Sequence, residues 1–185
     1  MTLSPPKVVI LDRDGVINED SDDYIKSVDE WVPIPGSLEA IARLHDAGIL
    51  LGIATNQSGV GRGLFTIDTL CDIHRHMLQE IVDHGGFVQH IFFCVHTPED
   101  HCDCRKPKPG LLHQAAEYFA CGLGNMTYVG DKVSDIEAAR AAGAIPVLVR
   151  TGKGAETEQQ LEPTQLPQVY DDLAAFADAL IKQNT

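Results

Sequence analysis

The feature that most constrains the fold of this chain is a short apolar run that ends in two acids. Val8–Leu11 is wholly apolar and rich in β-branched residues, and Asp12, Arg13, Asp14 and Gly15 follow directly. Such a run predicts a strand buried on both faces, as in a parallel sheet. Because ligands of open α/β sheets bind at the carboxyl ends of strands, the two acids stand where chemistry is expected. A simple turn accounts for one Asp and the Gly, but not for the second acid.

Strand and helix patterns then alternate along the chain. Apolar runs predict strands at 49–54, 90–95, 126–129 and 146–149. Helical spacing of apolar residues predicts helices at 37–47, 66–84, 111–119 and 171–181, and a further helix that ends at Ala142. Ser134 and Glu137 are interpreted as a capping box for the helix through Ala142, and 152–168, with two prolines, as a surface connection. The alternation predicts a doubly wound α/β fold with a mostly parallel sheet.

Length and charge limit the classes of partner. With 185 residues and 44% hydrophobic content, we expect one domain over 1–185, with a C-terminal connection and helix at 152–185. The connections leave no room for a separate cap domain. A net charge of −13 disfavours nucleic acid and anionic membranes, so an anionic substrate needs a local positive site with a cation. We expect neither a signal peptide, because Met1–Pro6 lacks a basic region followed by an apolar stretch, nor a membrane span, because no apolar run is long enough. We expect a cytoplasmic protein, a monomer or a small homo-oligomer.

A short loop at 94–104 gathers metal-ligand residues. Cys94, His96, Cys102 and Cys104 supply three thiols and one imidazole, a set suited to tetrahedral zinc. The alternatives are buried free cysteines, or His101 as a substitute ligand. A disulfide is disfavoured by the expected compartment. Cys71 falls in the expected helix at 66–84 and Cys121 near the end of the one at 111–119, and both are interpreted as core residues.

Other strand ends carry groups suited to phosphate chemistry. Thr55 begins a polar, glycine-rich loop, which on its own could equally be a flexible loop. Arg105 and Lys106 follow the last expected zinc ligand, and Asp131 follows the strand at 126–129. Carboxylates gathered at one point are typical of a Mg²⁺ site, and a hydroxyl with a lysine beside the metal can hold a phosphoryl group.

Taken together, these motifs carry a family resemblance. The order DRDG, TNQSG, RKPKPG and GDKVSD resembles the haloacid dehalogenase (HAD) superfamily of phosphohydrolases, from about Val8 to about Gly154. The cysteine–histidine loop before RKP is similar to the corresponding loop of one subgroup, which contains heptose bisphosphate phosphatases and histidinol-phosphate phosphatases. The segments 12–18, 34–36 and 55–59, with Arg62 and Gly63, resemble the heptose enzymes.

The resemblance implies an activity. It implies a Mg²⁺-dependent phosphatase that removes the C7 phosphate of D-glycero-D-manno-heptose 1,7-bisphosphate and leaves the 1-phosphate. Such a phosphorylated sugar would be consumed in the synthesis of nucleotide-activated heptose for lipopolysaccharide core or surface glycans. Histidinol phosphate is the alternative substrate within the subgroup.

The resemblance also implies residue roles. Asp12 would be the nucleophile and Asp14 the general acid and base. Mg²⁺ would be held by the Asp12 carboxylate, the Asp14 backbone carbonyl and Asp131. Lys132 and Asp135 would support the metal site. The substrate would be bound by Thr55, Asn56, Gln57, Ser58, Arg62, Arg105 and Lys106.

Two classes of protein outside this family share part of this pattern. A receiver-type signalling domain also combines acids, a hydroxyl, a lysine and Mg²⁺, but its acid pair and its phosphorylated Asp lie on different strands. A catalytically inactive binding protein is disfavoured because each expected catalytic position is filled. Repeated release of phosphate from a generic ester separates an enzyme from a receiver, which stops after one turnover.

Overall fold

The computed structural model of the chain describes residues 7–183, which contain one six-stranded sheet. The strands are β1 (Val8–Leu11), β2 (Leu50–Asn56), β3 (His90–Cys94), β4 (Met126–Gly130), β5 (Ile145–Val149) and β6 (Gln168–Tyr170). Their order is β3-β2-β1-β4-β5-β6, and every neighbouring pair is parallel. The predicted doubly wound α/β fold is confirmed.

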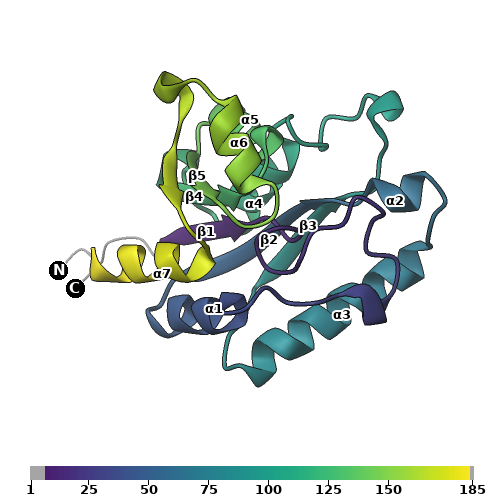
Figure 1. Cartoon of the computed structure of the whole chain (residues 1–185), viewed down its shortest axis with the longest axis horizontal. Coiled ribbons are helices and arrows are strands. Elements are labelled where there is room, and N and C mark those ends of the chain that lie inside the picture. Colours follow the sequence, from purple (N-terminus) through teal and green to yellow (C-terminus); the bar gives the residue numbers. More distant parts are fainter. Residues whose placement is uncertain (1–6, 184–185) are drawn as a thin grey trace.

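Helices cover both faces of this sheet (Figure 1). The longer helices are α1 (Ser37–Asp46), α3 (Ile67–Asp83), α4 (Gly110–Tyr118), α5 (Val133–Ala142) and α7 (Leu173–Lys182). Shorter ones are α2 (Ser58–Gly61) and α6 (Gly154–Gln160), with single 3-10 turns at Val28–Glu30, Pro98–Asp100, Leu123–Asn125 and Pro163–Gln165. Helices α1, α3 and α7 lie on one side of the sheet, and α4 and α5 on the other (Figure 1).

Strand β1 joins the two halves of the core. Val9 and Leu11 pack with the cluster that includes α1, α3 and α7, whereas Val8 and Ile10 pack with the cluster under α4 and α5. This is the period-two alternation of a strand that is covered on both faces. Each large aliphatic side chain buried this way contributes about 1.5–3 kcal/mol, so the strand that carries Asp12 is firmly anchored.

Two sequence-based expectations are wrong in detail. The segment 152–168, interpreted as a surface connection, contains α6 and leads into β6. Helix α6 (GAETEQQ) has no apolar stripe and β6 is a three-residue edge strand, so neither gives a periodic signal. Helix α5 begins at Val133, so Lys132 is its N-cap residue. The Lys132 backbone N–H donates a hydrogen bond to the Asp135 side chain (3.0 Å), and the predicted capping box of Ser134 and Glu137 does not form.

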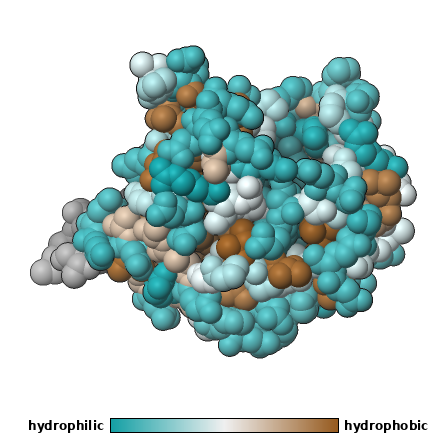
Figure 2. All heavy atoms as spheres, in the orientation of Figure 1, coloured by the Kyte–Doolittle hydropathy of each residue, from teal (hydrophilic) through white to brown (hydrophobic). Residues whose placement is uncertain are grey.

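One face of the molecule is mainly hydrophilic (Figure 2). Figure 2 shows mainly hydrophilic side chains on the face in view, with apolar residues scattered among them. Within residues 7–183, the structure has no helix whose length and hydropathy would let it cross a membrane.

Candidate active site

The candidate site lies at the carboxyl edge of the sheet, beside the point where the strand order reverses. Strands β1 and β4 are neighbours there, with β2 on the far side of β1. Such a switch point is where open α/β sheets bind their ligands. A small cavity of about 40 Å³ is lined by Asp12, Asp14, Thr55, Asn56, Lys106, Lys132 and Ser134. It shares lining residues with a larger cavity of about 350 Å³, a volume within the range of ligand pockets.

Asp12 and Lys106 form a buried ion pair at the base of this site. The Lys106 Nζ lies 2.9 Å from the Asp12 Oδ1 and 2.7 Å from the Asp135 Oδ1. Burial raises the pKa of Asp12 to about 6, although the lysine acts in the opposite direction. Burial would lower the pKa of Lys106, but the two carboxylates raise it, so the lysine remains a cation. Within residues 7–183, the Asp12 carboxylate accepts two hydrogen bonds, from Lys106 and from the Arg13 backbone N–H (2.8 Å). Both end on Oδ1, which leaves Oδ2 for a ligand.

Lys106 is held in place from β2 as well as from its own loop. The Asn56 side chain donates to the Lys106 carbonyl and accepts from its N–H, each at 3.1 Å. The Lys106 Nζ also donates to the Ala54 carbonyl (3.2 Å) and to the Tyr128 hydroxyl (2.7 Å). Asn56, predicted to bind substrate, therefore uses its amide to fix the backbone of the lysine.

Asp14 is surrounded by hydrogen-bond donors. Arg13 donates from Nε (3.0 Å) and Nη2 (2.9 Å) to Oδ1, and from Nη2 to Oδ2 (3.1 Å). Asn18 donates to Oδ1 and Gln57 to Oδ2, each at 2.9 Å. Burial by itself would raise the pKa of this carboxyl, but the charge of Arg13 and the side-chain hydrogen bonds hold it below its usual range. Gln57 also donates to the Thr55 hydroxyl (2.9 Å), which leaves the Thr55 proton free for an acceptor in the site.

Asp131 is enclosed by two glycines and a loop that sequence reasoning did not connect with the site. A Cβ added at Gly15 would lie 2.2 Å from the Asp131 Oδ2, and one at Gly152 would lie 2.3 Å from it. The Lys153 backbone N–H donates to Oδ2 (2.8 Å), and the Thr157 hydroxyl donates to the Asp131 carbonyl (2.8 Å). The segment after β5 thus helps to build the site. Its glycines and short polar side chains gave no sequence signal of this.

The Asp131 carboxylate has the properties of a cation ligand. Its Oδ1 is buried and accepts no hydrogen bond from the described chain, and burial raises its pKa to about 8. Asp12, Asp131 and Asp135 bring carboxylate oxygens within 4.8 Å of one another. The Asp135 oxygens are already occupied, Oδ1 by Lys106 and Tyr128 and Oδ2 by two backbone N–H groups. The unpartnered oxygen therefore fits a hard divalent cation, with Asp135 as a supporting residue.

The loop between β3 and α4 brings the predicted zinc ligands together. The sulfurs of Cys94, Cys102 and Cys104 lie 3.2–3.7 Å apart, and the His96 Nδ1 lies 3.5 and 3.4 Å from those of Cys94 and Cys104. Zn–S bonds of about 2.3 Å in a tetrahedron place sulfurs about 3.8 Å apart. The four residues thus fit a closed zinc site, while His101 lies outside the group.

This cluster is joined to the active-site lysine through one residue. The backbone N–H of Arg105 hydrogen-bonds to Cys102, and such bonds lower the pKa of that thiol to about 7, although burial acts to raise it. The Arg105 side chain donates to the His96 carbonyl (3.2 Å) and lines the larger cavity. The other two cysteines lie apart from the cluster. Cys71 is exposed on α3, so its interpretation as a core residue is wrong, whereas Cys121, after α4, is half-buried and packs against the core.

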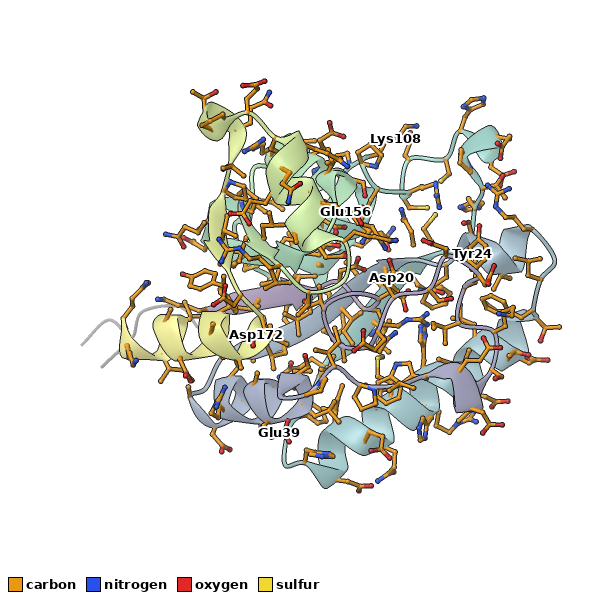
Figure 3. The ribbon with its side chains drawn as sticks, in the orientation of Figure 1. Asp20, Tyr24, Glu39, Lys108, Glu156 and Asp172 are labelled. Carbon is orange, nitrogen blue, oxygen red and sulfur yellow. The ribbon has the colours of Figure 1, made fainter. Side chains whose placement is uncertain are left out.

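The remaining predicted residues take different positions. Ser58, Gln57 and Lys132 line the larger cavity, whereas Arg62 is exposed at the end of α2 and lines neither site cavity. Two lysines pair with the acidic segment after β1: Lys132 with Asp20 and Lys153 with Asp22, each at 3.0 Å. Figure 3 shows Asp20 on this segment, which crosses the middle of the molecule. Sequence reasoning missed Lys153, which lies 22 residues beyond Asp131.

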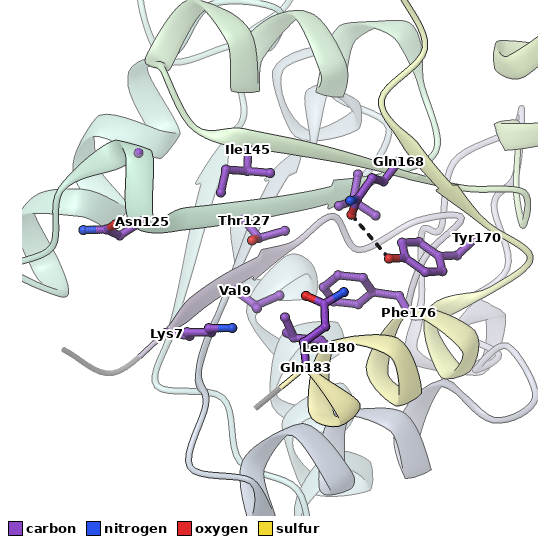
Figure 4. Close-up of a pocket in the computed structure, with 12 residues that line it drawn as sticks. Lys7, Val9, Asn125, Thr127, Ile145, Gln168, Tyr170, Phe176, Leu180 and Gln183 are labelled. Carbon is purple, nitrogen blue, oxygen red and sulfur yellow. Dashed lines mark hydrogen bonds between the residues drawn. The ribbon is translucent and has the colours of Figure 1, made fainter. Parts of the chain in front are cut away.

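A third cavity lies away from these residues, and Figure 4 shows its lining. Its volume is about 430 Å³, and β1, β4, β5, β6 and α7 contribute to its walls. Tyr170 and Gln168 are joined by a hydrogen bond of 3.3 Å across one side (Figure 4). The lining contains no carboxylate, so this cavity lacks the acid pair on which phosphoryl chemistry would depend.

Comparisons with known proteins agree with this geometry. Residues 103–176 match a family model described as HAD-hydrolase-like. The chain is 53% identical to the D-glycero-β-D-manno-heptose-1,7-bisphosphate 7-phosphatase of Pseudomonas putida over 95% of this chain and 99% of that protein. It is 45% identical to the enzyme of the same name from Neisseria meningitidis serogroup B, over 97% of each chain.

Solved structures give the same result. The D,D-heptose 1,7-bisphosphate phosphatase of B. bronchiseptica, complexed with magnesium and phosphate, superposes with a TM-score of 0.93 at 47% identity, over 96% of this chain and 99% of that one. The Burkholderia thailandensis enzyme of that name gives a TM-score of 0.74 at 40% identity, over 95% and 98%. Identity of this extent over nearly full length shows common ancestry and a common fold. The chain therefore belongs to the D-glycero-β-D-manno-heptose-1,7-bisphosphate 7-phosphatase family of HAD hydrolases.

Proposed function

We propose that the chain hydrolyses the C7 phosphate of D-glycero-β-D-manno-heptose 1,7-bisphosphate and retains the C1 phosphate. The observation that carries the proposal is the Asp12–Lys106 pair beside Asp14 at the β1 carboxyl end, in a chain whose full-length relatives bear the name of this activity. The β configuration at C1, which sequence motifs do not specify, is taken from the names of those relatives.

The residues divide the chemistry into two steps. An Asp12 carboxylate oxygen attacks the C7 phosphorus, and the P–O bond to the sugar breaks. The departing C7 oxygen takes a proton from Asp14, which must carry that proton when the substrate is bound although Arg13 and the side-chain hydrogen bonds favour its ionised form. Water then attacks the phosphorus of the aspartyl-phosphate, Asp14 takes a proton from that water, and phosphate leaves with Asp12 restored. Lys106 and the Thr55 hydroxyl hold the phosphoryl oxygens throughout.

A divalent cation fits the acidic side of the site. Mg²⁺ would be held by the Asp12 and Asp131 carboxylates with the Asp14 backbone carbonyl, and when bound it would neutralise charge on the transferring phosphoryl group. The unpartnered, buried Asp131 Oδ1 supports this assignment. Burial costs an unpaired carboxylate several kcal/mol, so the chain gains by placing a cation there.

The lining of the larger cavity supports binding of a second phosphate group. Its cationic lining consists of Arg105, Lys106, Lys132 and Lys153. Lys106 and Lys132 also line the inner cavity, which leaves Arg105 and Lys153 for the C1 phosphate. Breaking the ion pair between Lys153 and Asp22 costs little free energy. The Asp22 side chain is 86% exposed, and such surface pairs contribute about 0–1 kcal/mol to stability. A planar guanidinium is well suited to bidentate phosphate contact.

The test follows both phosphates during turnover. Phosphorus NMR of the heptose bisphosphate with enzyme and Mg²⁺ should show loss of the C7 resonance, growth of inorganic phosphate and an unchanged C1 resonance. In parallel, kcat/KM is compared between this substrate and histidinol phosphate. Release of the C1 phosphate, or a higher kcat/KM for histidinol phosphate, would overturn the proposal.

A further inference from the structure

Arg13, the residue between the two catalytic acids, is a fully buried cation that the chemistry above does not use. Its side chain has 0% exposure, and its guanidinium contacts both oxygens of Asp14. Nη1 is buried and has no hydrogen-bond partner within residues 7–183. Among the described residues, the Arg13 side chain hydrogen-bonds only to the Asp14 carboxylate, so it is placed to fix the position of that carboxylate.

Stability alone does not account for an arginine at this position. Removing a cation from water costs several kcal/mol, and well-packed apolar residues often replace a buried ion pair without loss of stability. The unpartnered Nη1 adds a further cost. What an apolar residue could not supply is the two-pronged contact, since the rigid fork of a guanidinium fixes the plane of a carboxylate.

The local backbone is built around this contact. The Arg13 carbonyl accepts hydrogen bonds from the N–H groups of Val16, Ile17 and Asn18, so the chain after Asp14 turns back on Arg13. That turn brings the Asn18 amide to the Asp14 Oδ1 and to the Glu19 carbonyl. Gln57, between β2 and α2, restrains only the other oxygen. The three side chains together leave the carboxylate little freedom to rotate.

We infer that Arg13 is the positioning residue that holds the Asp14 carboxyl in line with the leaving-group oxygen. This inference rests on the proposed function, in which Asp14 protonates that oxygen. A general acid is effective only within hydrogen-bond reach of its target, so a carboxyl free to rotate loses part of its contribution. Binding of the phosphoryl group itself does not depend on this contact, because Lys106 and the Thr55 hydroxyl hold the phosphoryl oxygens.

The inference predicts a dependence on the leaving group. A sugar alcohol is a poor leaving group and needs the proton, whereas p-nitrophenolate departs without one. Arg13→Lys keeps the charge but loses the fork, and Asp14→Asn removes the acid. Both should lower kcat/KM for the heptose bisphosphate far more than for p-nitrophenyl phosphate. We expect the ratio of kcat/KM for the heptose bisphosphate to kcat/KM for p-nitrophenyl phosphate to fall about 10²-fold or more in Asp14→Asn, within the range of general acid catalysis. In Arg13→Lys the same ratio should fall about 10-fold.

Controls separate this role from a structural one. Arg75→Lys, at an exposed arginine paired with Asp72 on α3, should leave the ratio unchanged. Arg13→Gln, which keeps one donor, is the second variant if Arg13→Lys does not fold by circular dichroism, and its ratio should fall in the same way. Equal loss on both substrates in the folded Arg13 variant, with a selective loss in Asp14→Asn, would overturn the role of Arg13 alone. Equal loss on both substrates in Asp14→Asn would overturn the acid role of Asp14, and the inference with it.

Discussion

Gly15 offers a sharp test of how the metal side of the site is built. This glycine has a φ of +85°, and a Cβ there would lie 2.2 Å from the Asp131 Oδ2. The left-handed backbone costs an alanine about 1–2 kcal/mol. Relieving the overlap costs a further 1–3 kcal/mol, roughly the cost of overpacking a core. We therefore expect Gly15→Ala to lower the free energy of unfolding by about 2–5 kcal/mol.

The chain contains a matched control for the backbone part of this cost. Gly48 has a φ of +75°, and a Cβ there would meet nothing within 4 Å. Gly48→Ala should therefore show the backbone cost alone, about 1–2 kcal/mol. Urea unfolding of the three proteins gives the difference. In thermal unfolding, each kcal/mol corresponds to about 2–4 °C for a chain of this size.

The overlap should also change the metal requirement. Asp131 is held on its other side by the Lys153 N–H, so an added methyl group at residue 15 moves the carboxylate away from the position that fits a cation. Disturbing the surroundings of a metal ligand typically costs about 10–100-fold in metal affinity. We expect the Mg²⁺ concentration for half-maximal activity to rise by that factor in Gly15→Ala and not in Gly48→Ala. Equal unfolding free energies and equal Mg²⁺ requirements in the two variants would refute the role given to Gly15.

Three further perturbations test other parts of the site. Asp12→Asn should abolish turnover of the heptose bisphosphate while the circular dichroism spectrum stays native, because the nucleophile and a cation ligand are lost together; near-normal activity would contradict the mechanism. Lys153→Ala should raise KM for the bisphosphate about tenfold or more, the loss expected from one charged hydrogen bond, and leave a heptose 7-monophosphate unaffected. Lys26→Ala, at a surface lysine paired with Glu30, is its control. Cys102→Ser should lower the zinc content found by metal analysis and weaken catalysis, because the loop that carries Arg105 and Lys106 loses its anchor. Protein purified without chelators that contains no zinc would count against the site.

The sequence by itself was enough to predict the fold class and the clustering of the main reactive groups. Period-two and helical patterns give the order of strands and helices, and parallel strands bring their carboxyl ends to one edge. Asp12 and Asp131 therefore meet although 119 positions separate them, and the zinc ligands fall within one short loop. These features depend on local patterns and on a topological rule, both of which can be read along the chain.

Only the tertiary structure decided which side chains bond to which. Asn56 and Gln57 were predicted to bind substrate, but their amides are used on the Lys106 backbone and on Asp14 with Thr55. Lys153 enters the site from a segment interpreted as a surface connection. Such partners depend on distances of about 3 Å between segments far apart in sequence. Composition and periodicity say which face a residue occupies, but not which of several neighbouring donors and acceptors lies closest.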